Sequence, residues 1–172
     1  MILVGSVPAA TLPPNPDDPT ADQRVQEAIR LIQSGSAVDA GVNQLTQAAV
    51  AGHEEAKYTL GWLLLRGAAL PKDNDRALHL LESIDGDLKI AARILIGVVY
   101  AEGSNQFAPN KEQAQRAFEQ AAAALNEQMR EFRKSPPSSP RDIALRKQWL
   151  EDWTVLVGMA GKYELAVPRR TN

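Results

Sequence analysis

The sequence predicts an all-α protein made of repeated helix pairs, and three observations lead to this prediction. Apolar residues recur at helical spacing through most of the 172 residues. Aromatic residues make up only 5% of the chain while alanine and leucine abound, a balance that suits closely packed helices better than sheets. A glycine-containing helical motif returns after 36 residues. The length fits a single domain.

The first nineteen residues are predicted to form an extended arm. Segment 1–19 holds five prolines and has no helical period. One interpretation is a disordered leader. The other is an arm that docks in a partner's groove, with Ile2, Leu3 and Val4 as its apolar anchor. Because Arg24 is the first basic residue, an intact signal peptide is not expected.

Five helices are predicted before residue 103. Thr20 with Gln23 is a capping-box pattern, and Gly35 stops the apolar period that begins there. Asp73 is expected to cap the fourth helix. The predicted ranges are about 20–34, 37–50, 54–66, 74–84 and 88–102.

The sixth helix is predicted to be the longest of the first six. Asn110 with Gln113 is a second capping-box pattern, and no breaker follows before about Lys134. A proline- and serine-rich turn at 135–139 then ends the helical array, which therefore spans 20–134.

A C-terminal capping helix is predicted at 140–163. Ser139 offers an N-cap, Pro140 suits the first helical position, and Asp142 is well placed for the helix dipole. The broad apolar side of this helix is predicted to comprise Ile143, Leu145, Trp149, Leu150, Trp153, Leu156 and Val157. Residues 164–172 are expected to form a tail.

A unit of two helices repeats along the chain. AKYTLGWLLLRG at 56–67 and ARILIGVVYAEG at 92–103 share one design at an offset of 36, and the following helices match at an offset of 37. The matched positions are Ala56 and Ala92, Leu60 and Ile96, Gly61 and Gly97, Gly67 and Gly103, Ala77 and Ala114, and Leu81 and Phe118. A helix pair repeated at such a period is typical of an α/α solenoid.

These motifs resemble the Sel-one-like repeats, a branch of the tetratricopeptide-type solenoids, over about residues 37–125. AKYTLGWLLLRG, DNDRALHLLESID, ARILIGVVYAEG and NKEQAQRAFEQAA follow the family's pattern. The resemblance implies a short right-handed solenoid of antiparallel helix pairs. It also implies scaffold or adaptor work, often in bacterial envelope processes or large assemblies.

The glycines of the motif have predicted structural roles. Gly61 and Gly97 would let two helices approach closely, and Gly67 and Gly103 would end a helix in a left-handed turn. The chain departs from the family where Ala69 and Asn105 replace a second glycine, and where Ile84 and Asp85 replace an Ala-Ala pair. The Asp85-Gly86 pair is expected to end the fourth helix early.

Composition narrows the function classes. The net charge of −2 favours neither nucleic acid nor an anionic membrane, and the absence of cysteine excludes thiolate chemistry and disulfides. No apolar run reaches the roughly 18 residues of a membrane helix, so a soluble protein is expected, in the periplasm or the cytoplasm. No phosphate-binding loop or nucleophile elbow is present, so no cofactor is expected.

The titratable residues do not form a recognisable catalytic or metal-binding motif. His53 and His79 lie 26 residues apart without metal-ligand spacing, and are assigned a capping or surface role. Acidic residues gather at predicted helix boundaries, where they cap helices. Trp149 and Trp153, four residues apart, are predicted to pack in the core or cap.

The sequence therefore predicts a non-catalytic protein-binding module that uses its concave helical face, its arm, or both, a role compatible with a subunit of a larger assembly. The candidate contacts on helices are Lys57, Trp62, Arg66, Arg93 and Glu102, although Trp62 could equally belong to the core. One alternative is an inhibitor or immunity-type protein that masks one enzyme. A more remote alternative is a hydrolase that uses Glu82, Asp85 or Asp87.

Overall fold

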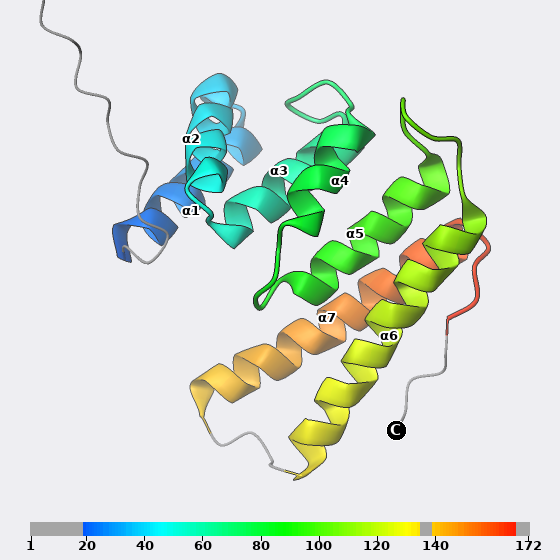
Figure 1. Ribbon diagram of the computed structural model, residues 1–172. Helices are drawn as coiled ribbons and strands as arrows, with labels where there is room; N and C mark the ends of the chain where they lie inside the picture. Colours follow the sequence, from blue (N-terminus) through cyan, green and yellow to red (C-terminus); the bar gives the residue numbers. More distant parts are fainter. Residues whose placement is uncertain (1–18, 135–138, 168–172) are drawn as a thin grey trace, which may run out of the picture.

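The protein is all-α, as predicted. The computed structural model describes residues 19–134 and 139–167, and these contain seven helices and no strand (Figure 1). The predicted arm with Ile2, Leu3 and Val4 lies outside the described residues, as do most of the 135–139 turn and the end of the tail. The helices are α1 (Pro19–Ser34), α2 (Val38–Val50), α3 (Glu54–Arg66), α4 (Asn74–Glu82), α5 (Lys89–Glu102), α6 (Lys111–Lys134) and α7 (Pro140–Lys162).

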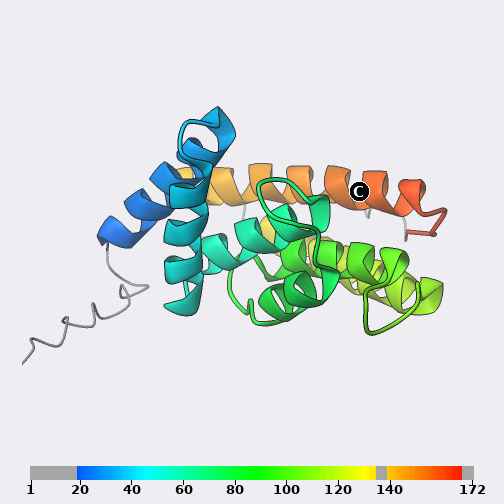
Figure 2. The ribbon, with the colours of Figure 1, turned by 90° about the horizontal axis from the view of Figure 1, so that it is seen from above.

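Each helix packs mainly on its neighbours in the sequence. In addition, α1 touches α3, α3 touches α5, and α5 touches α7. Figure 1 shows the resulting row of helices, and Figure 2 shows α7 lying along one side of the others. The core follows this order, because three apolar clusters are each built by three successive helices. Their central side chains are Val25, Leu45 and Leu60, then Leu64, Leu81 and Leu95, then Ile94, Phe118 and Trp149.

The local signals placed most helix ends correctly. The Asp73 side chain accepts a hydrogen bond from the Arg76 backbone N–H at 3.0 Å, and the Asn110 side chain accepts one from Gln113 at 2.9 Å. Ser139 and Asp142 form a complete capping box. These bonds satisfy backbone donors that a helix start leaves unpaired.

The ends of α1 and α4 differ from those predicted. The helix α1 begins at Pro19, one residue before the predicted start, and the Thr20 hydroxyl accepts a hydrogen bond from the Arg24 side chain within the helix. The helix α4 ends at Glu82, two residues before the predicted 84. The Ser83 hydroxyl donates to the Leu80 carbonyl at 2.7 Å and takes up one of the last carbonyls of the helix.

The predicted close approach at the two mid-helix glycines is confirmed. A Cβ on Gly61 would lie 3.0 Å from the Leu81 side chain, and a Cβ on Gly97 would lie 2.7 Å from the Phe118 ring. The terminal glycines differ from each other. Gly67 has the left-handed helical conformation, with φ 64° and ψ 28°. Gly103 also ends its helix with a positive φ of 74°, as predicted, but its ψ of −177° places it outside the left-handed helical region.

The helix α7 buries a narrower face than predicted. Trp149, Trp153 and Leu156 are buried, and the two indole rings stack with centroids 6.0 Å apart. The Trp149 indole N–H donates to the Leu125 carbonyl of α6. The other predicted members of the apolar side remain exposed, namely Ile143, Leu145, Leu150 and Val157.

Candidate functional site

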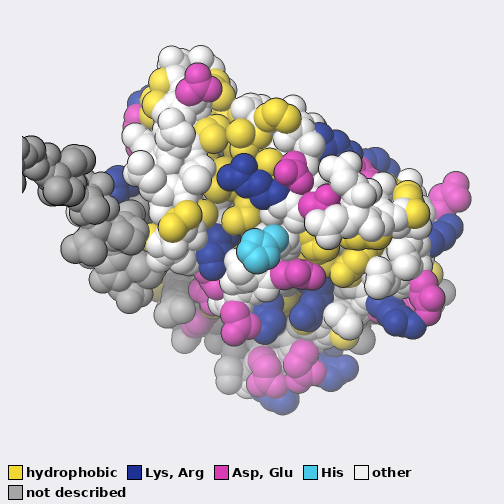
Figure 3. Space-filling view, turned by 45° about the horizontal axis from the view of Figure 1, so that its top comes forward, with side chains coloured by type: hydrophobic (Ala, Val, Ile, Leu, Met, Phe, Trp, Pro, Cys, Tyr) yellow, Lys and Arg dark blue, Asp and Glu magenta, His cyan; other side chains and the backbone are white. Residues whose placement is uncertain are grey.

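An apolar groove of about 570 Å³ opens between α1 and α3. We call it the α1–α3 groove, and it is lined by Ile29, Ile32, Gln33, Val38, Tyr58, Thr59, Trp62, Leu63, Ala68 and Ala69. Figure 3 shows apolar side chains gathered beside the α1–α2 end of the molecule, with charged side chains of both signs around them. A concave surface with few polar groups is typical of a binding site.

The periodicity of the two helices produces this groove. On α1, Val25 and Ala28 face the core, so Ile29 and Ile32 fall on the neighbouring flank and are only half-buried. On α3, Leu60 and Leu64 face the core while Tyr58 and Trp62, four residues apart, share the groove side. The loop after α3 closes one end, where Ala69 adopts a φ of 64°.

Trp62 and Arg66 form the most distinctive part of the groove. The Trp62 side chain is 39% exposed, although tryptophan is usually largely buried. The Arg66 guanidinium lies 5.5 Å from the centroid of its ring, at cation–π distance. Among the described residues, no carboxylate pairs with Arg66 and no acceptor takes the Trp62 indole N–H. A ligand could therefore use an apolar surface, an N–H donor and a positive charge in one place.

Tyr58 on the wall of the groove carries a phenol with a shifted pKa. Burial raises the pKa of the Tyr58 phenol, and the negative charge of Asp152 on α7 raises it further. Burial also raises the pKa of Asp152, although a hydrogen bond from Gln148 acts in the opposite direction. The phenol therefore stays protonated at neutral pH and can donate a hydrogen bond.

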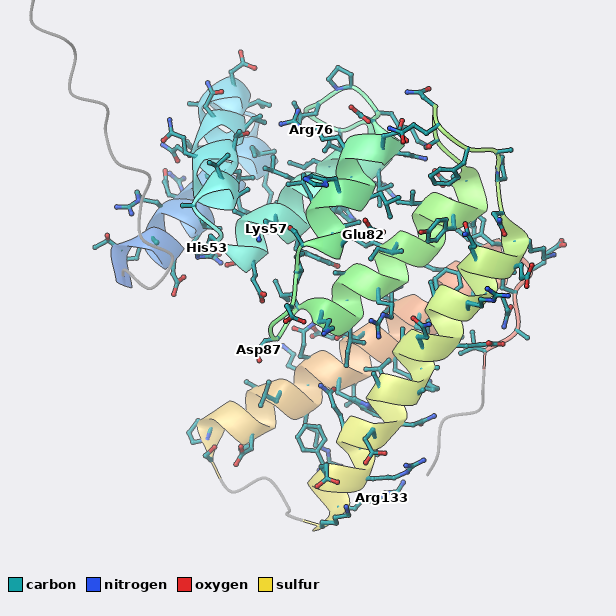
Figure 4. All side chains as sticks on the ribbon, in the orientation of Figure 1. His53, Lys57, Arg76, Glu82, Asp87 and Arg133 are labelled. Carbon is teal, nitrogen blue, oxygen red and sulfur yellow. The ribbon has the colours of Figure 1, made fainter. Side chains whose placement is uncertain are left out.

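The other predicted contact residues lie elsewhere. The Lys57 ammonium donates to the Ser83 carbonyl at 3.2 Å and so points to the α4–α5 turn (Figure 4). Arg93 lines two separate hollows, one beside α4 and α6 and one beside α6 and α7. The structure thus brings Trp62 and Arg66 together and places Lys57 and Arg93 apart from them.

Glu102 is engaged within the molecule. Its carboxylate accepts hydrogen bonds from Lys72 at 2.6 Å, from Lys162 at 3.3 Å and from the Tyr163 hydroxyl. Burial acts to raise the pKa of Glu102, but the hydrogen bonds from Lys72 and Tyr163 outweigh it, and the pKa lies below its usual range. The residue joins the loop after α3 and the end of α7 to α5.

His53 does not have the role predicted for it. It occupies the N-cap position of α3 without capping the helix through its side chain, and it is buried rather than on the surface. Its Nε2 lies 2.7 Å from the Asp22 carboxylate of α1 (Figure 4 labels His53). His79, by contrast, is exposed as predicted.

A turn anchor at the α4–α5 connection was not predicted at all. Glu54, at the start of α3, accepts hydrogen bonds from the backbone N–H groups of Asp85 at 3.0 Å and Gly86 at 2.6 Å. A Cβ on Gly86 would collide with this carboxylate. The Asp-Gly pair signals a turn, but no sequence pattern links it to a glutamate thirty residues earlier.

The candidate hydrolase carboxylates are placed on the surface. Glu82, Asp85 and Asp87 are exposed, and Figure 4 shows Asp87 at the tip of the α4–α5 turn. The hydrogen bond and the charge of Lys89 hold the pKa of Asp85 below its usual range. General acid catalysis near neutral pH needs the opposite shift.

Three further findings bear on function. Within the described ranges, no three acidic or histidine side chains gather where they could hold a metal ion. None of the helices in that part of the chain has the length and apolar character to span a bilayer. Comparisons with protein-family models, with curated proteins and with solved structures found no match.

Proposed function

We propose that this chain is a non-catalytic protein-binding module, a short right-handed solenoid of antiparallel Sel-one-like helix pairs, and that the α1–α3 groove holds a segment of its partner. The observation that carries the proposal is the half-exposed Trp62 in an apolar groove. The glycine contacts that recur at Gly61 and Gly97, and the clusters shared by successive helices, support the solenoid.

The chemistry of the groove specifies the segment it fits. One apolar side chain of the partner fills the space between Ile32, Tyr58 and Trp62. Burying such a side chain contributes about 1.5–3 kcal/mol. A backbone carbonyl accepts the indole N–H, and an acidic residue pairs with Arg66. Tryptophan and arginine are the residue types most enriched at energetic hot spots of interfaces.

A selection experiment tests this proposal. A displayed library of random peptides is selected on the full-length protein, and the affinities of the enriched peptides are then measured for the original protein and for Trp62→Ala. The enriched peptides are expected to share an apolar residue close to an acidic one. Because Trp149 and Trp153 are buried, binding should shift the emission of Trp62, and the titration also gives the stoichiometry. Peptides that bind Trp62→Ala as tightly as the original protein would contradict the proposal.

Two arginines provide a matched control. Arg66→Glu should lower the affinity for the selected peptides roughly tenfold, because it removes the positive charge at the groove and introduces a negative one that repels their acidic residue. Arg93 lines other hollows, so Arg93→Glu should leave the affinity for the peptides unchanged. Equal losses in both variants would place the binding site elsewhere, and unchanged melting temperatures would confirm that both variants fold.

A further inference from the structure

The helix α7 carries an apolar stripe that belongs to none of the three core clusters. Ile143, Leu150 and Val157 stand seven residues apart, and their side chains are 61%, 44% and 50% exposed. We call these three residues the α7 stripe. A seven-residue spacing keeps side chains nearly in line along a helix, because an ideal helix drifts only about 20° per heptad.

The stripe lies on one flank of α7, and the hollow that α7 shares with α5 and α6 lies on the other flank. The buried ridge of α7 runs through Trp149 and Trp153. Asp152, which lines the hollow shared with α5 and α6, lies on the other flank of that ridge. At 100° per residue, the stripe is about 80° to 120° round the helix from Trp149, on the opposite side from Asp152. Packing within the described chain therefore does not account for it.

Exposed apolar residues at heptad spacing form the seam along which two helices pack. The stripe is moreover symmetric about its centre, because Ile143 and Val157 are equally far from Leu150. We propose that the stripe binds the same stripe of a second copy of this chain, with the two α7 helices antiparallel and Leu150 on the two-fold axis. Leu150 then packs on Leu150 of the second copy, and Ile143 packs on its Val157. Such a surface is self-complementary, as an isologous interface requires.

The charges beside the stripe agree with this register. Lys147 and Glu151 flank it on one side and pair within the helix at 3.7 Å. In the antiparallel arrangement, Lys147 of one copy lies within about 3 Å, along the helix axis, of the level of Glu151 of the second copy. Two pairs of opposite charges therefore form across the interface, and the two-fold axis relates one Lys147–Glu151 pair to the other.

The interface is expected to be weak. A helix of 23 residues is about 34 Å long, and a seam one helix wide over that length is at the low end of protein interfaces. Association should therefore depend on concentration. A covalent trap at the axis is the most sensitive test, and the absence of cysteine from the chain makes it simple.

The test introduces single cysteines into the full-length protein. Leu150→Cys should form a disulfide-linked dimer under mild oxidation, because the two Cβ atoms meet at the axis. Val155→Cys is the matched control, since Val155 is 41% exposed on the same helix but outside the stripe. Efficient dimers of the first variant and none of the second are expected. Equal cross-linking of both variants, or none of Leu150→Cys, would overturn the proposal.

Charge exchange tests the register without relying on cysteine. Lys147→Glu and Glu151→Lys should each associate roughly threefold to tenfold more weakly than the original chain, because each places like charges across the axis. A mixture of the two variants should form mixed dimers and recover the original affinity. Failure of the mixture to recover would rule out the antiparallel register. Val50→Glu, at an exposed apolar site on α2, should leave association unchanged.

Discussion

The helix pairs α3–α4 and α5–α6 share one contact and differ in what lies beyond it. In each pair a glycine of the first helix lies under a large side chain of the second, Leu81 over Gly61 and Phe118 over Gly97. Yet α4 has nine residues and α6 has twenty-four. The comparison teaches that the crossing point is set by the paired residues, while the length of the second helix is set separately.

Local sequence explains the different lengths. After Leu81 the chain reaches Ser83 and the Asp85-Gly86 turn, which Glu54 holds in place. After Phe118 it continues through a run of four alanines, the best helix formers. The additional turns of α6 supply Leu125 and the half-buried Met129 to the cluster that packs on α7.

The largest effect is expected where the extension of α6 meets α7. Trp149→Ala removes a fully buried side chain, its ring stack and its hydrogen bond to Leu125, and should lower the free energy of unfolding by about 3–5 kcal/mol. Urea denaturation followed by circular dichroism measures this loss. Trp62→Ala is the control, and its loss should be under about 1 kcal/mol because the side chain is partly exposed. Similar losses in both variants would contradict the assignment of Trp149 to the core.

The two glycine contacts should respond differently to the same change. Gly97→Ala places a methyl group 2.7 Å from the ring of Phe118, which is fully buried, and should lower the free energy of unfolding by about 1–2 kcal/mol. Gly61→Ala meets the Leu81 side chain at 3.0 Å, and the small shift it requires is offset by a gain of about 1 kcal/mol in helix propensity.

A third glycine, without such a contact, serves as the reference for that comparison. Apart from its chain neighbours and the backbone of its own helix, no atom of the described residues would lie within 4 Å of a Cβ on Gly158, in the interior of α7. Gly158→Ala should therefore stabilise the protein by about 0.5–1 kcal/mol. Thermal melts of the three variants should therefore rank Gly158→Ala highest and Gly97→Ala lowest. A Gly97→Ala variant as stable as Gly61→Ala would show that the two crossings are equally tight.

The turn after α4 should loosen when its anchor is removed. Glu54→Ala deletes the acceptor for the Asp85 and Gly86 N–H groups and should lower the free energy of unfolding by about 1 kcal/mol. Hydrogen exchange should quicken at these two amides first. As a control, Glu82→Ala removes an exposed carboxylate at the end of α4, and it should change neither the hydrogen-exchange rate at these two amides nor the free energy of unfolding.

Much of the fold could be predicted because its signals are local. Asp73, Asn110 and Ser139 cap helices through neighbouring backbone groups, so sequence alone locates them. The spacing of apolar residues likewise identified α7. It could not say that Trp149 would be buried and Leu150 exposed, because that division depends on where α5 and α6 lie.

The candidate site was predicted only in part for the same reason. Trp62 and Arg66 are four residues apart on one helix, so their proximity follows from helical geometry. The groove beside them needs Ile29 and Ile32 of α1, about thirty residues away in the sequence. The contact of the buried His53 with the exposed Asp22 also joins distant segments, and a lone histidine carries no signal of its partner.

The smallest expected effect concerns Glu102, which ties the loop before α4 and the end of α7 to α5. Its pKa in the folded protein lies below its usual value of about 4.5. The carboxylate therefore contributes stability at neutral pH, and this contribution is lost as the pH falls through the lowered pKa. Glu102→Gln should cost under about 1 kcal/mol at pH 7, because the ion pairs are partly exposed. The difference between the two proteins should shrink as the pH falls from 5 to 3. A difference that stays constant over this range would mean that the hydrogen bond from Tyr163, which a glutamine can also accept, matters more than the charge.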